Sequence, residues 1–269
     1  MYRATINGRT EALKLVHIPS FAGIDDPQPF QDECLARVRR EVQTLADCQN
    51  PNVVKLGSIA PRQVAMLGES LIAYSEEYLP GKDLRALIKD GWWPEEPELR
   101  TLFLTLLAAI KSLWELPNRV VHRDIKPDNI IRLDDDSRPF VLLDLGIAYA
   151  VFDTALTVNP EQRLPVGTFP YLAPEMFQPN FRDTIDYRSD LYAAALTVYE
   201  CATGRHPLAR EGEYLVKTLT RILQDTPPPL RSARADLSPV LCDMVDGMLK
   251  KRPPLRPANL AMLIKKLQS

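Results

Sequence analysis

The pattern of apolar and polar residues near the amino terminus predicts a β-hairpin. Polar and apolar residues alternate on both sides of Asn7 and Gly8, in the segments 2–6 and 11–17. Alternation is typical of strands with one buried face, and Asn-Gly is a dipeptide that tight hairpin turns favour. We therefore expect these two segments to pair as antiparallel strands.

Further along, the pattern predicts one helix and then more strands. Residues 30–48 carry apolar side chains at helical spacing, which indicates an amphipathic helix. Segments 53–60 and 70–78 are short apolar runs of the kind that form strands. The first eighty residues are thus expected to build a small sheet with one helix.

Helical patterns dominate from residue 83 onwards. The clearest are 98–114, 188–203 and 237–250, and the proline-rich segment 224–231 is typical of a rigid surface connection between helices. The predicted fold class is therefore α+β, with a small β-rich lobe that contains one helix, followed by a larger helical lobe.

Composition narrows the class of protein further. The chain has 269 residues, and its 33 basic and 35 acidic side chains nearly cancel, so its overall charge does not indicate a nucleic-acid partner. The four cysteines form no C-x-x-C pair, which favours reduced thiols over metal ligation or disulfides. The sequence has neither an apolar run long enough to span a bilayer nor a signal peptide. It therefore predicts a cytoplasmic protein with no membrane segment.

The segment VVHRDIKPDNII, residues 120–131, gathers charged and amide side chains between two apolar stretches. Its Asp124 and Asn129 are followed by VLLDLG, where Asp144 ends a second apolar run. Oxygen atoms on a loop and on a neighbouring strand end can converge on Mg²⁺, which takes a few oxygen ligands and completes its shell with phosphates and water. Such a site leaves one carboxylate free to accept a proton from a hydroxyl.

Three short motifs follow one another along the chain: HRDIKPDN, DLG and APE, the last at 173–175. Together with EALK, RREVQ and YRSDLYAAALTVYE, they resemble the motifs of eukaryotic-type (Hanks-type) serine/threonine protein kinases, with HRDIKPDN as the catalytic loop. The form GTFPYLAPE is similar to bacterial members. The resemblance covers nearly the whole chain and implies one bilobal kinase domain, with an N-lobe at about 1–78, a hinge at about 77–82 and a C-lobe at about 83–269.

The resemblance implies a role for each polar residue of these motifs. Asp124 would orient the substrate hydroxyl and accept its proton, and Lys126 would reach the transferring phosphoryl group. Asn129 and Asp144 would bind Mg²⁺, which accompanies ATP as the cofactor. A lysine two residues after the aspartate is the pattern of serine/threonine kinases. The implied function is transfer of the γ-phosphoryl group of Mg-ATP to protein serine and threonine hydroxyls, autophosphorylation included.

A second set of residues would bind the nucleotide. Lys14, in EALK, is expected to contact the α- and β-phosphates and to be held by Glu41, with Glu33 as the alternative partner. Five residues around the hinge would bind adenine: Ala12, Glu77, Tyr78, Leu79 and Ile131. Glu76 would face the back of the adenine pocket, where a buried carboxylate is costly unless it finds a cation such as Lys14. The alternative is that the register of this segment is shifted by one residue.

Other motif residues are expected to support the structure. Asp190 is predicted to be a buried carboxylate that accepts backbone N–H bonds from the catalytic loop. Glu175 and Arg256 are predicted to form a buried ion pair. His122 is expected to pack in the apolar interior and not to act as an acid or base.

Regulation is predicted to depend on the segment between DLG and APE. Arg123 precedes the catalytic aspartate, so a phosphate on Thr154 or Thr157 could order this segment by pairing with its guanidinium. Thr168 is expected to hydrogen-bond the catalytic loop and to support the substrate.

The glycine-rich loop of the family is missing, because no G-x-G-x-x-G occurs and the family's first strand has no counterpart before Lys14. An unpaired sheet edge would result. Three explanations stay open: a start that lies upstream, a kinase whose sheet is completed by a strand from a partner or a second copy, and a pseudokinase that acts as a nucleotide-binding or interaction module.

Two alternatives to a protein kinase are weaker on the same residues. A scaffold needs none of the polar residues that the chain retains together: Lys14, Glu41, Asp124, Asn129 and Asp144. A small-molecule kinase of the aminoglycoside type would not need the segment ending in APE, which in the family builds a platform for protein substrates.

Overall fold

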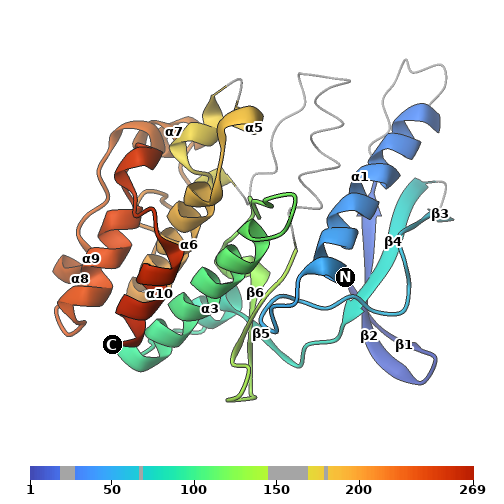
Figure 1. Cartoon of the computed structure of the whole chain (residues 1–269), viewed down its shortest axis with the longest axis horizontal. Coiled ribbons are helices and arrows are strands. Elements are labelled where there is room, and N and C mark those ends of the chain that lie inside the picture. The colour runs from blue at the N-terminus through green and yellow to red at the C-terminus, as the bar shows by residue number, and fades with distance from the viewer. Residues whose placement is uncertain (19–27, 67–68, 145–168, 179–180) are drawn as a thin grey trace. The chain divides into compact units, whose positions relative to one another are not determined.

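The structure is a computed structural model, and it describes residues 1–18, 28–66, 69–144, 169–178 and 181–269 (Figure 1). The described chain falls into two compact units. Unit 1 consists of the described residues up to Pro80, without Asn50–Asn52, and of Asp144. Unit 2 consists of Asn50–Asn52, Gly81–Leu143 and the described residues from 169 onwards.

Unit 1 is built on a four-stranded antiparallel sheet in the order β1-β2-β4-β3. Its strands are β1 (Tyr2–Ile6), β2 (Arg9–His17), β3 (Arg62–Met66) and β4 (Glu69–Glu77). The predicted hairpin is confirmed, because β1 pairs antiparallel with β2. Asn7 and Gly8 form its turn with φ of 52° and 77°, in the left-handed region that these two residue types enter most readily.

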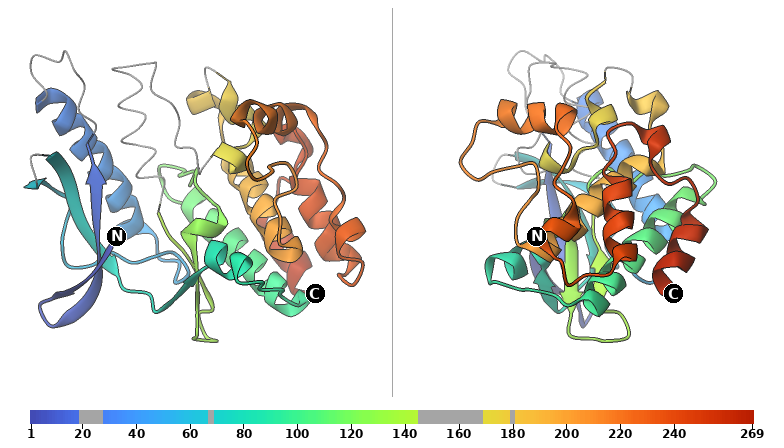
Figure 2. Two further views of the ribbon diagram at one scale, coloured as in Figure 1. Left: turned by 180° about the vertical axis from the view of Figure 1, so that it is seen from behind. Right: turned by 90° about the vertical axis from the view of Figure 1, so that its left-hand side faces the viewer.

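Helix α1 (Gln28–Asp47) packs against this sheet (Figure 2). Cys34, Val38 and Val42 of the helix join Ile72 and Tyr74 of β4 in one buried cluster. These helix residues lie four apart, so they share one face of the helix. The predicted amphipathic helix is confirmed, and burial of its apolar face explains the pattern.

The strand predicted at 53–60 is wrong, because this segment has isolated bridge residues, Val53 and Leu56, and no continuous strand. Leu56 bridges to Glu76 of β4. Several amides of the segment donate to side-chain oxygens, where a regular ladder uses carbonyl groups. The amide of Lys55 donates to Glu77 Oε1 at 2.8 Å, and two further amides of the segment also donate to side chains. The ladder is interrupted, and the outer strand beside β4 is β3.

Unit 2 is mainly helical (Figure 1). Its helices are α2 (Leu84–Lys89), α3 (Glu96–Trp114), α5 (Phe181–Thr184), α6 (Tyr187–Thr203), α7 (Leu215–Gln224), α8 (Leu230–Ala233), α9 (Pro239–Met248) and α10 (Leu260–Gln268). A three-stranded antiparallel sheet consists of β5 (Gly81–Asp83), β6 (Ile130–Leu133) and β7 (Phe140–Leu142). The three predicted helices are confirmed, and so is the α+β fold class with a β-rich first part and a helical second part.

Helix α6 is the core helix of unit 2. Every residue from Ser189 to Ala202 is buried, and the helix contacts both α3 and α9. Asp186 caps its start by accepting the amide of Arg188 at 2.8 Å, and Gly204 ends it with a φ of 71°. A helix buried on all sides has no solvent-facing stripe, so each polar side chain it carries needs a partner inside the protein.

Two glycines of unit 2 offer a matched test of packing. A Cβ at Gly81 would lie 2.2 Å from the carbonyl oxygen of Arg132, whereas a Cβ at Gly247 in α9 would meet nothing within 4 Å. Gly81→Ala is expected to destabilise the protein by about 1–3 kcal/mol, because a backbone carbonyl cannot move aside. Gly247→Ala is expected to stabilise it by about 0.5–1 kcal/mol, since alanine favours helices. Thermal unfolding measures both effects, and equal stability of Gly81→Ala and the parent would contradict the close approach.

Candidate active site

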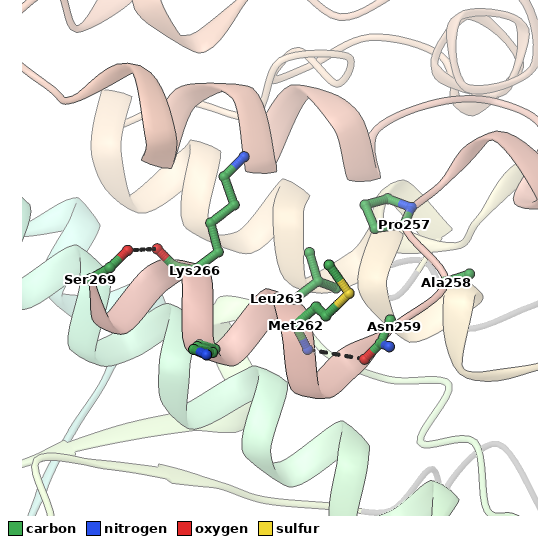
Figure 3. Close-up of a pocket in the computed structure, with 8 residues that line it drawn as sticks. Pro257, Ala258, Asn259, Met262, Leu263, Lys266 and Ser269 are labelled. Atoms are coloured by element: carbon green, nitrogen blue, oxygen red, sulfur yellow. Dashed lines mark hydrogen bonds between the residues drawn. The ribbon is translucent and has the colours of Figure 1, made fainter.

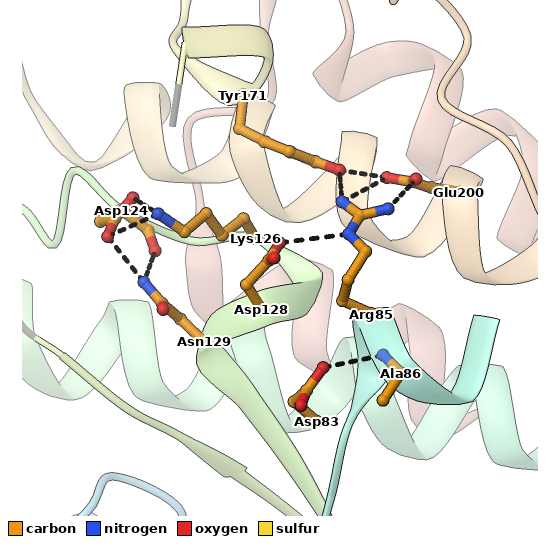
Figure 4. A network of polar contacts seen from close by, with 9 residues as sticks. All are labelled: Asp83, Arg85, Ala86, Asp124, Lys126, Asp128, Asn129, Tyr171 and Glu200. Carbon is orange, nitrogen blue, oxygen red and sulfur yellow. Dashed lines mark hydrogen bonds and ion pairs between the residues drawn. The ribbon is translucent and has the colours of Figure 1, made fainter. Parts of the chain in front are cut away.

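The loop that carries Asp124 lies between α3 and β6 and ends in a 3₁₀ turn, Pro127–Asn129 (Figure 4). The ammonium of Lys126 donates to both oxygens of the Asp124 carboxylate, at 2.8 and 3.0 Å. The side-chain amide of Asn129 donates to Asp124 twice, to its carbonyl oxygen at 2.8 Å and to Oδ2 at 2.7 Å. The structure thus brings three of the predicted site residues together, with Lys126 and Asn129 fixing the orientation of the carboxylate.

Asp190 of α6 holds the backbone of this loop. The amides of His122 and Arg123 donate to its two carboxylate oxygens at 2.7 and 2.9 Å. Burial raises the pKa of Asp190 to about 6, although these two hydrogen bonds oppose the shift. Arg123 has a φ of 68°, a conformation that a non-glycine residue keeps only where its surroundings hold it. The predicted role of Asp190 as a buried acceptor of N–H bonds is confirmed.

His122 joins the catalytic loop to the strand that leads to Asp144. The ring Nε2 lies 3.0 Å from the carbonyl oxygen of Leu143, and Nδ1 accepts the amide of Asp124 at 3.3 Å. With Nδ1 as an acceptor, we assign the proton to Nε2, which then donates to Leu143. The amide of Leu143 in turn donates to the carbonyl oxygen of Asn129 at 2.8 Å. His122 is therefore buried, as predicted, and hydrogen bonds at both ring nitrogens hold it there. That it does not act as an acid or base stays a prediction.

Lys14 lies in β2 of unit 1, with its side chain 10% exposed. Its ammonium forms ion pairs with Glu76 Oε2, at 2.8 Å, and with the carboxylate of Asp144. Burial alone would lower the pKa of Lys14, but the two carboxylates raise it above its ordinary value. The side chain therefore stays charged. Asp144 has a φ of 50°, a second strained conformation at a predicted site residue.

The sequence predicts that Glu76 needs a nearby cation if it is buried. In the structure Lys14 is that cation. Glu76 lies in β4 opposite Ala12 and is 1% exposed. Burial raises its pKa, and the charge of Lys14 opposes this shift. Its Oε1 is buried without a hydrogen-bond partner in the part of the chain that the structure describes. The side chain of Glu41 in α1 lies outside that part, so its pairing with Lys14 stays a prediction.

The residues predicted to bind adenine lie in both units. Ala12 is buried in β2, and Glu77 ends β4 with a carboxylate that accepts a backbone amide at 2.8 Å. Tyr78 and Leu79 follow directly, Tyr78 exposed and Leu79 partly buried. Ile131 lies in β6. The structure places each residue within its own unit, and adenine binding by these residues stays a prediction.

A polar network around Arg85 of α2 adds residues that the sequence analysis leaves without a role. The guanidinium contacts Glu200 of α6, the hydroxyl of Tyr171, and Asp128 Oδ2 at 3.3 Å (Figure 4). These four residues, the Arg85 network, line a cavity of about 1030 Å³ in unit 2. Because Asp128 belongs to the catalytic loop, the cavity adjoins that loop. The sequence signal is that Asp128, Tyr171 and Glu200 lie inside the quoted motifs.

His206 lines the same cavity, and its burial makes the stability of the protein depend on pH. Its Nδ1 accepts the amides of Leu208 and Ala209 at 3.0 and 2.8 Å. Burial, together with the charge of Arg85, lowers the pKa of His206 from 6.5 to about 3. The unfolded chain therefore takes up this proton near pH 6.5 and the folded chain only near pH 3. The stability that depends on neutral His206 is complete above pH 6.5 and is lost as the pH falls towards 3.

His206→Asn is expected to make the free energy of unfolding less dependent on pH between 6.5 and 4. The asparagine oxygen can accept the same two amides and takes up no proton in this range. The slope is expected to fall by at most about 1.4 kcal/mol per pH unit. Urea unfolding at pH 7, 6, 5 and 4 measures it, with His17→Asn at an exposed histidine as the control. An unchanged slope in His206→Asn would show that His206 titrates alike in the folded and unfolded chain.

The predicted ion pair between Glu175 and Arg256 is confirmed in unit 2. The guanidinium donates to both carboxylate oxygens of Glu175, at 2.6 and 2.8 Å, and its side chain has 0% exposure. It also donates to three backbone carbonyl oxygens, those of Arg188, Lys250 and Lys251. Ser189 of α6 donates to Glu175 at 2.7 Å. The pair therefore connects the APE motif to the core helix.

Three further features of the structure concern possible ligand sites, metal sites and membrane-spanning helices. A second hollow, of about 710 Å³, is lined by residues between Pro257 and Ser269, half of them in α10, and by none of the predicted site residues (Figure 3). Among the residues that the structure describes, no group of three or more His, Cys, Asp and Glu side chains could hold a metal ion. A search of the same residues finds no helix with the length and apolar character needed to cross a membrane.

Part of the predicted regulation falls outside the described residues. Thr154, Thr157 and Thr168 all lie there. Arg123, the predicted partner of a phosphate, has its Nε atom buried without a hydrogen-bond partner among the residues that are described. Pairing of Arg123 with a phosphorylated threonine stays a prediction.

Comparison with known proteins gives one consistent family. The family model of the protein kinase domain matches residues 12–267. The chain is 34% identical over 203 residues to the probable serine/threonine-protein kinase PknB of Bifidobacterium longum, and the aligned residues make up 74% of this chain and 27% of that protein. It is 30% identical over 246 residues to the serine/threonine-protein kinase PknD of Mycobacterium tuberculosis, covering 91% and 33%. It is 29% identical over 246 residues to the serine/threonine-protein kinase pkn3 of Myxococcus xanthus, covering 88% and 42%. The chain thus spans less than half the length of these relatives.

Proposed function

Since this chain belongs to the protein kinase family, we propose that it transfers the γ-phosphoryl group of ATP to serine and threonine hydroxyls of protein substrates. The observation that carries the proposal is the fixed carboxylate of Asp124, which Lys126 and Asn129 orient. Asp190 holds the backbone of the same loop. A carboxylate held in this way can orient a hydroxyl and take its proton.

The donor atoms of the chain fit Mg²⁺ and the phosphates of ATP. Asn129 uses its Nδ2 to hold Asp124, so its amide oxygen is the atom left for a cation, and Asp144 offers carboxylate oxygens. Mg²⁺ takes hard oxygen ligands of this kind and keeps water and phosphate oxygens in its other positions. We assign Asn129 and Asp144 as its ligands and the charged Lys14 as the partner of the α- and β-phosphates. When bound, the metal ion neutralises charge on the phosphates.

The proposed reaction is an in-line displacement at the γ-phosphorus. Asp124 orients the hydroxyl and accepts its proton while the new O–P bond forms and the bond to ADP breaks. Lys126, which lies beside Asp124, offsets the negative charge of the phosphoryl group during transfer. Its position two residues after Asp124 supports serine and threonine, and not tyrosine, as acceptors.

We also propose that a further strand pairs with β1. In the order β1-β2-β4-β3, β1 is an edge strand, and most of its residues are exposed. An exposed edge can accept a strand from a partner or from a second copy of the chain.

We propose a cytoplasmic location, because the four cysteines are free and buried, as reducing conditions would leave them. No nucleic-acid partner is proposed.

Incubation with γ-labelled ATP, Mg²⁺ and casein tests the proposed activity. We expect label on casein or on the protein itself, and acid hydrolysis is expected to give phosphoserine and phosphothreonine. A parallel reaction with kanamycin tests the small-molecule alternative, which label on kanamycin alone would favour. Thermal stabilisation by ATP without transfer to any protein would favour a nucleotide-binding module and contradict the proposal.

A further inference from the structure

We propose that Glu76 is the positioning residue of Lys14: its carboxylate, on the neighbouring strand, holds the ammonium in place for the phosphates of ATP. The proposal rests on the proposed function and adds a residue to it. The resemblance gives this role to Glu41 in α1, whereas the ion pair in the structure joins two strands of one sheet.

The pair is built into the sheet of unit 1. In the register of β2 and β4, Lys14 lies opposite Tyr74 and Ala12 opposite Glu76, so Lys14 and Glu76 are diagonal neighbours on one face. The distance of 2.8 Å between Nζ and Oε2 is typical of a charge-assisted hydrogen bond. The side chains are 10% and 1% exposed, so water does not compete for either partner. Strand pairing therefore sets the position of the ammonium.

Glu76 can be a permanent carboxylate partner of Lys14, whereas Asp144 cannot. Lys14 faces the carboxylates of Asp144 and Glu76, and its Nζ lies 5.9 Å from the ring centre of Tyr74. Asp144 is assigned to the metal ion, so its oxygens are not a permanent partner for the lysine. Glu76 is not assigned to the metal ion and stays beside Lys14 throughout. Lys14 thus keeps one carboxylate both with and without nucleotide.

Burial of the Glu76 carboxylate would be unfavourable if it did not pair with Lys14. Its Oε1 is buried without a hydrogen-bond partner in the described part of the chain, and Glu77 and Asp144 add repulsion. A buried acid with one oxygen unpaired is less favourable than an apolar side chain of similar volume. The benefit of a carboxylate at this position therefore lies in what it does for Lys14.

A double-mutant cycle tests the proposal. Glu76→Gln, Lys14→Met and the double variant are compared with the parent for the Kd of a fluorescent ATP analogue with Mg²⁺, and for unfolding without nucleotide. We expect Glu76→Gln to weaken nucleotide binding about tenfold when Lys14 is present and to have no effect in the Lys14→Met background. Glu76→Asp keeps the charge and is expected to recover part of the loss.

Glu11→Gln is the matched control, because Glu11 is a buried carboxylate in β2, the strand that pairs with β4, and bonds Ser58 and Ser75 in place of Lys14. It is expected to leave the Kd unchanged. The proposal is overturned if Glu76→Gln weakens binding equally in both backgrounds, or if Glu41→Gln weakens it and Glu76→Gln does not. Absence of nucleotide binding in every protein, parent included, would contradict the proposed function. In that case the unfolding measurements still test whether Glu76 and Lys14 interact. If the losses of unfolding free energy in the two single variants add up in the double variant, the interaction is excluded, and if they do not add up, the interaction is supported.

Discussion

Replacing Asp124 by asparagine is expected to lower the rate of phosphoryl transfer by about 10²- to 10⁴-fold, because asparagine keeps the shape of the side chain but cannot take the proton of the hydroxyl. The single amide oxygen can still accept from Lys126, and Asn129 keeps its bond to the carbonyl oxygen of residue 124 although it loses the side-chain acceptor. The backbone of the loop is therefore expected to keep its conformation. The loss is therefore expected in kcat, with the affinity for ATP within about twofold of the parent.

Initial rates with γ-labelled ATP and casein, together with the Kd of ATP, measure this prediction. Asp134→Asn is the matched control, because Asp134 is an exposed aspartate just beyond β6 and outside the site. A rate for Asp124→Asn within about tenfold of the parent would remove Asp124 as the proton acceptor, and an equal loss in Asp134→Asn would indicate a general defect.

Arg256→Met is expected to cause a large loss of stability, about 3–5 kcal/mol. The change leaves the Glu175 carboxylate, 14% exposed, without its cation. Three backbone carbonyl oxygens also lose a donor. For a chain of this size the melting temperature is expected to fall by roughly 10 °C.

Calorimetry or circular dichroism measures the shift, and two further variants define its cause. Arg252→Met removes an exposed arginine nearby and is expected to have little effect. Glu175→Leu combined with Arg256→Met removes both charges and is expected to be more stable than Arg256→Met alone. If the melting temperature of Arg256→Met equals that of the parent, the buried pair does not stabilise the fold.

The parts of the structure that could be predicted are those that few residues decide. The hairpin depends on Asn7 and Gly8, the two residue types that most readily take a positive φ. The contacts of Asp124 come from Lys126 and Asn129, within the same short motif. Such contacts depend little on the rest of the chain, so the motif carries most of the geometry with it.

The parts that could not be predicted depend on contacts between distant segments. Segment 53–60 has the composition of a strand, but the carboxylates of Glu11 and Glu77 accept amides there. The Arg85 network joins four separate segments, and no local pattern around Arg85 indicates its partners. For Glu76, the cost of a buried acid predicts the need for a cation, and the register of two strands decides which cation is near.

Helix α6 has a consequence for how sequences of this fold can change. It carries Asp190, which holds the catalytic loop, and Glu200, which belongs to the Arg85 network. One residue inserted between them would turn one end of the helix by about 100° relative to the other and separate one of the two from its partners. Substitutions of similar volume are tolerated far better in a packed core. We expect variants of this chain to accept exchanged apolar residues in α6, and to reject any change in the number of residues between Asp190 and Glu200.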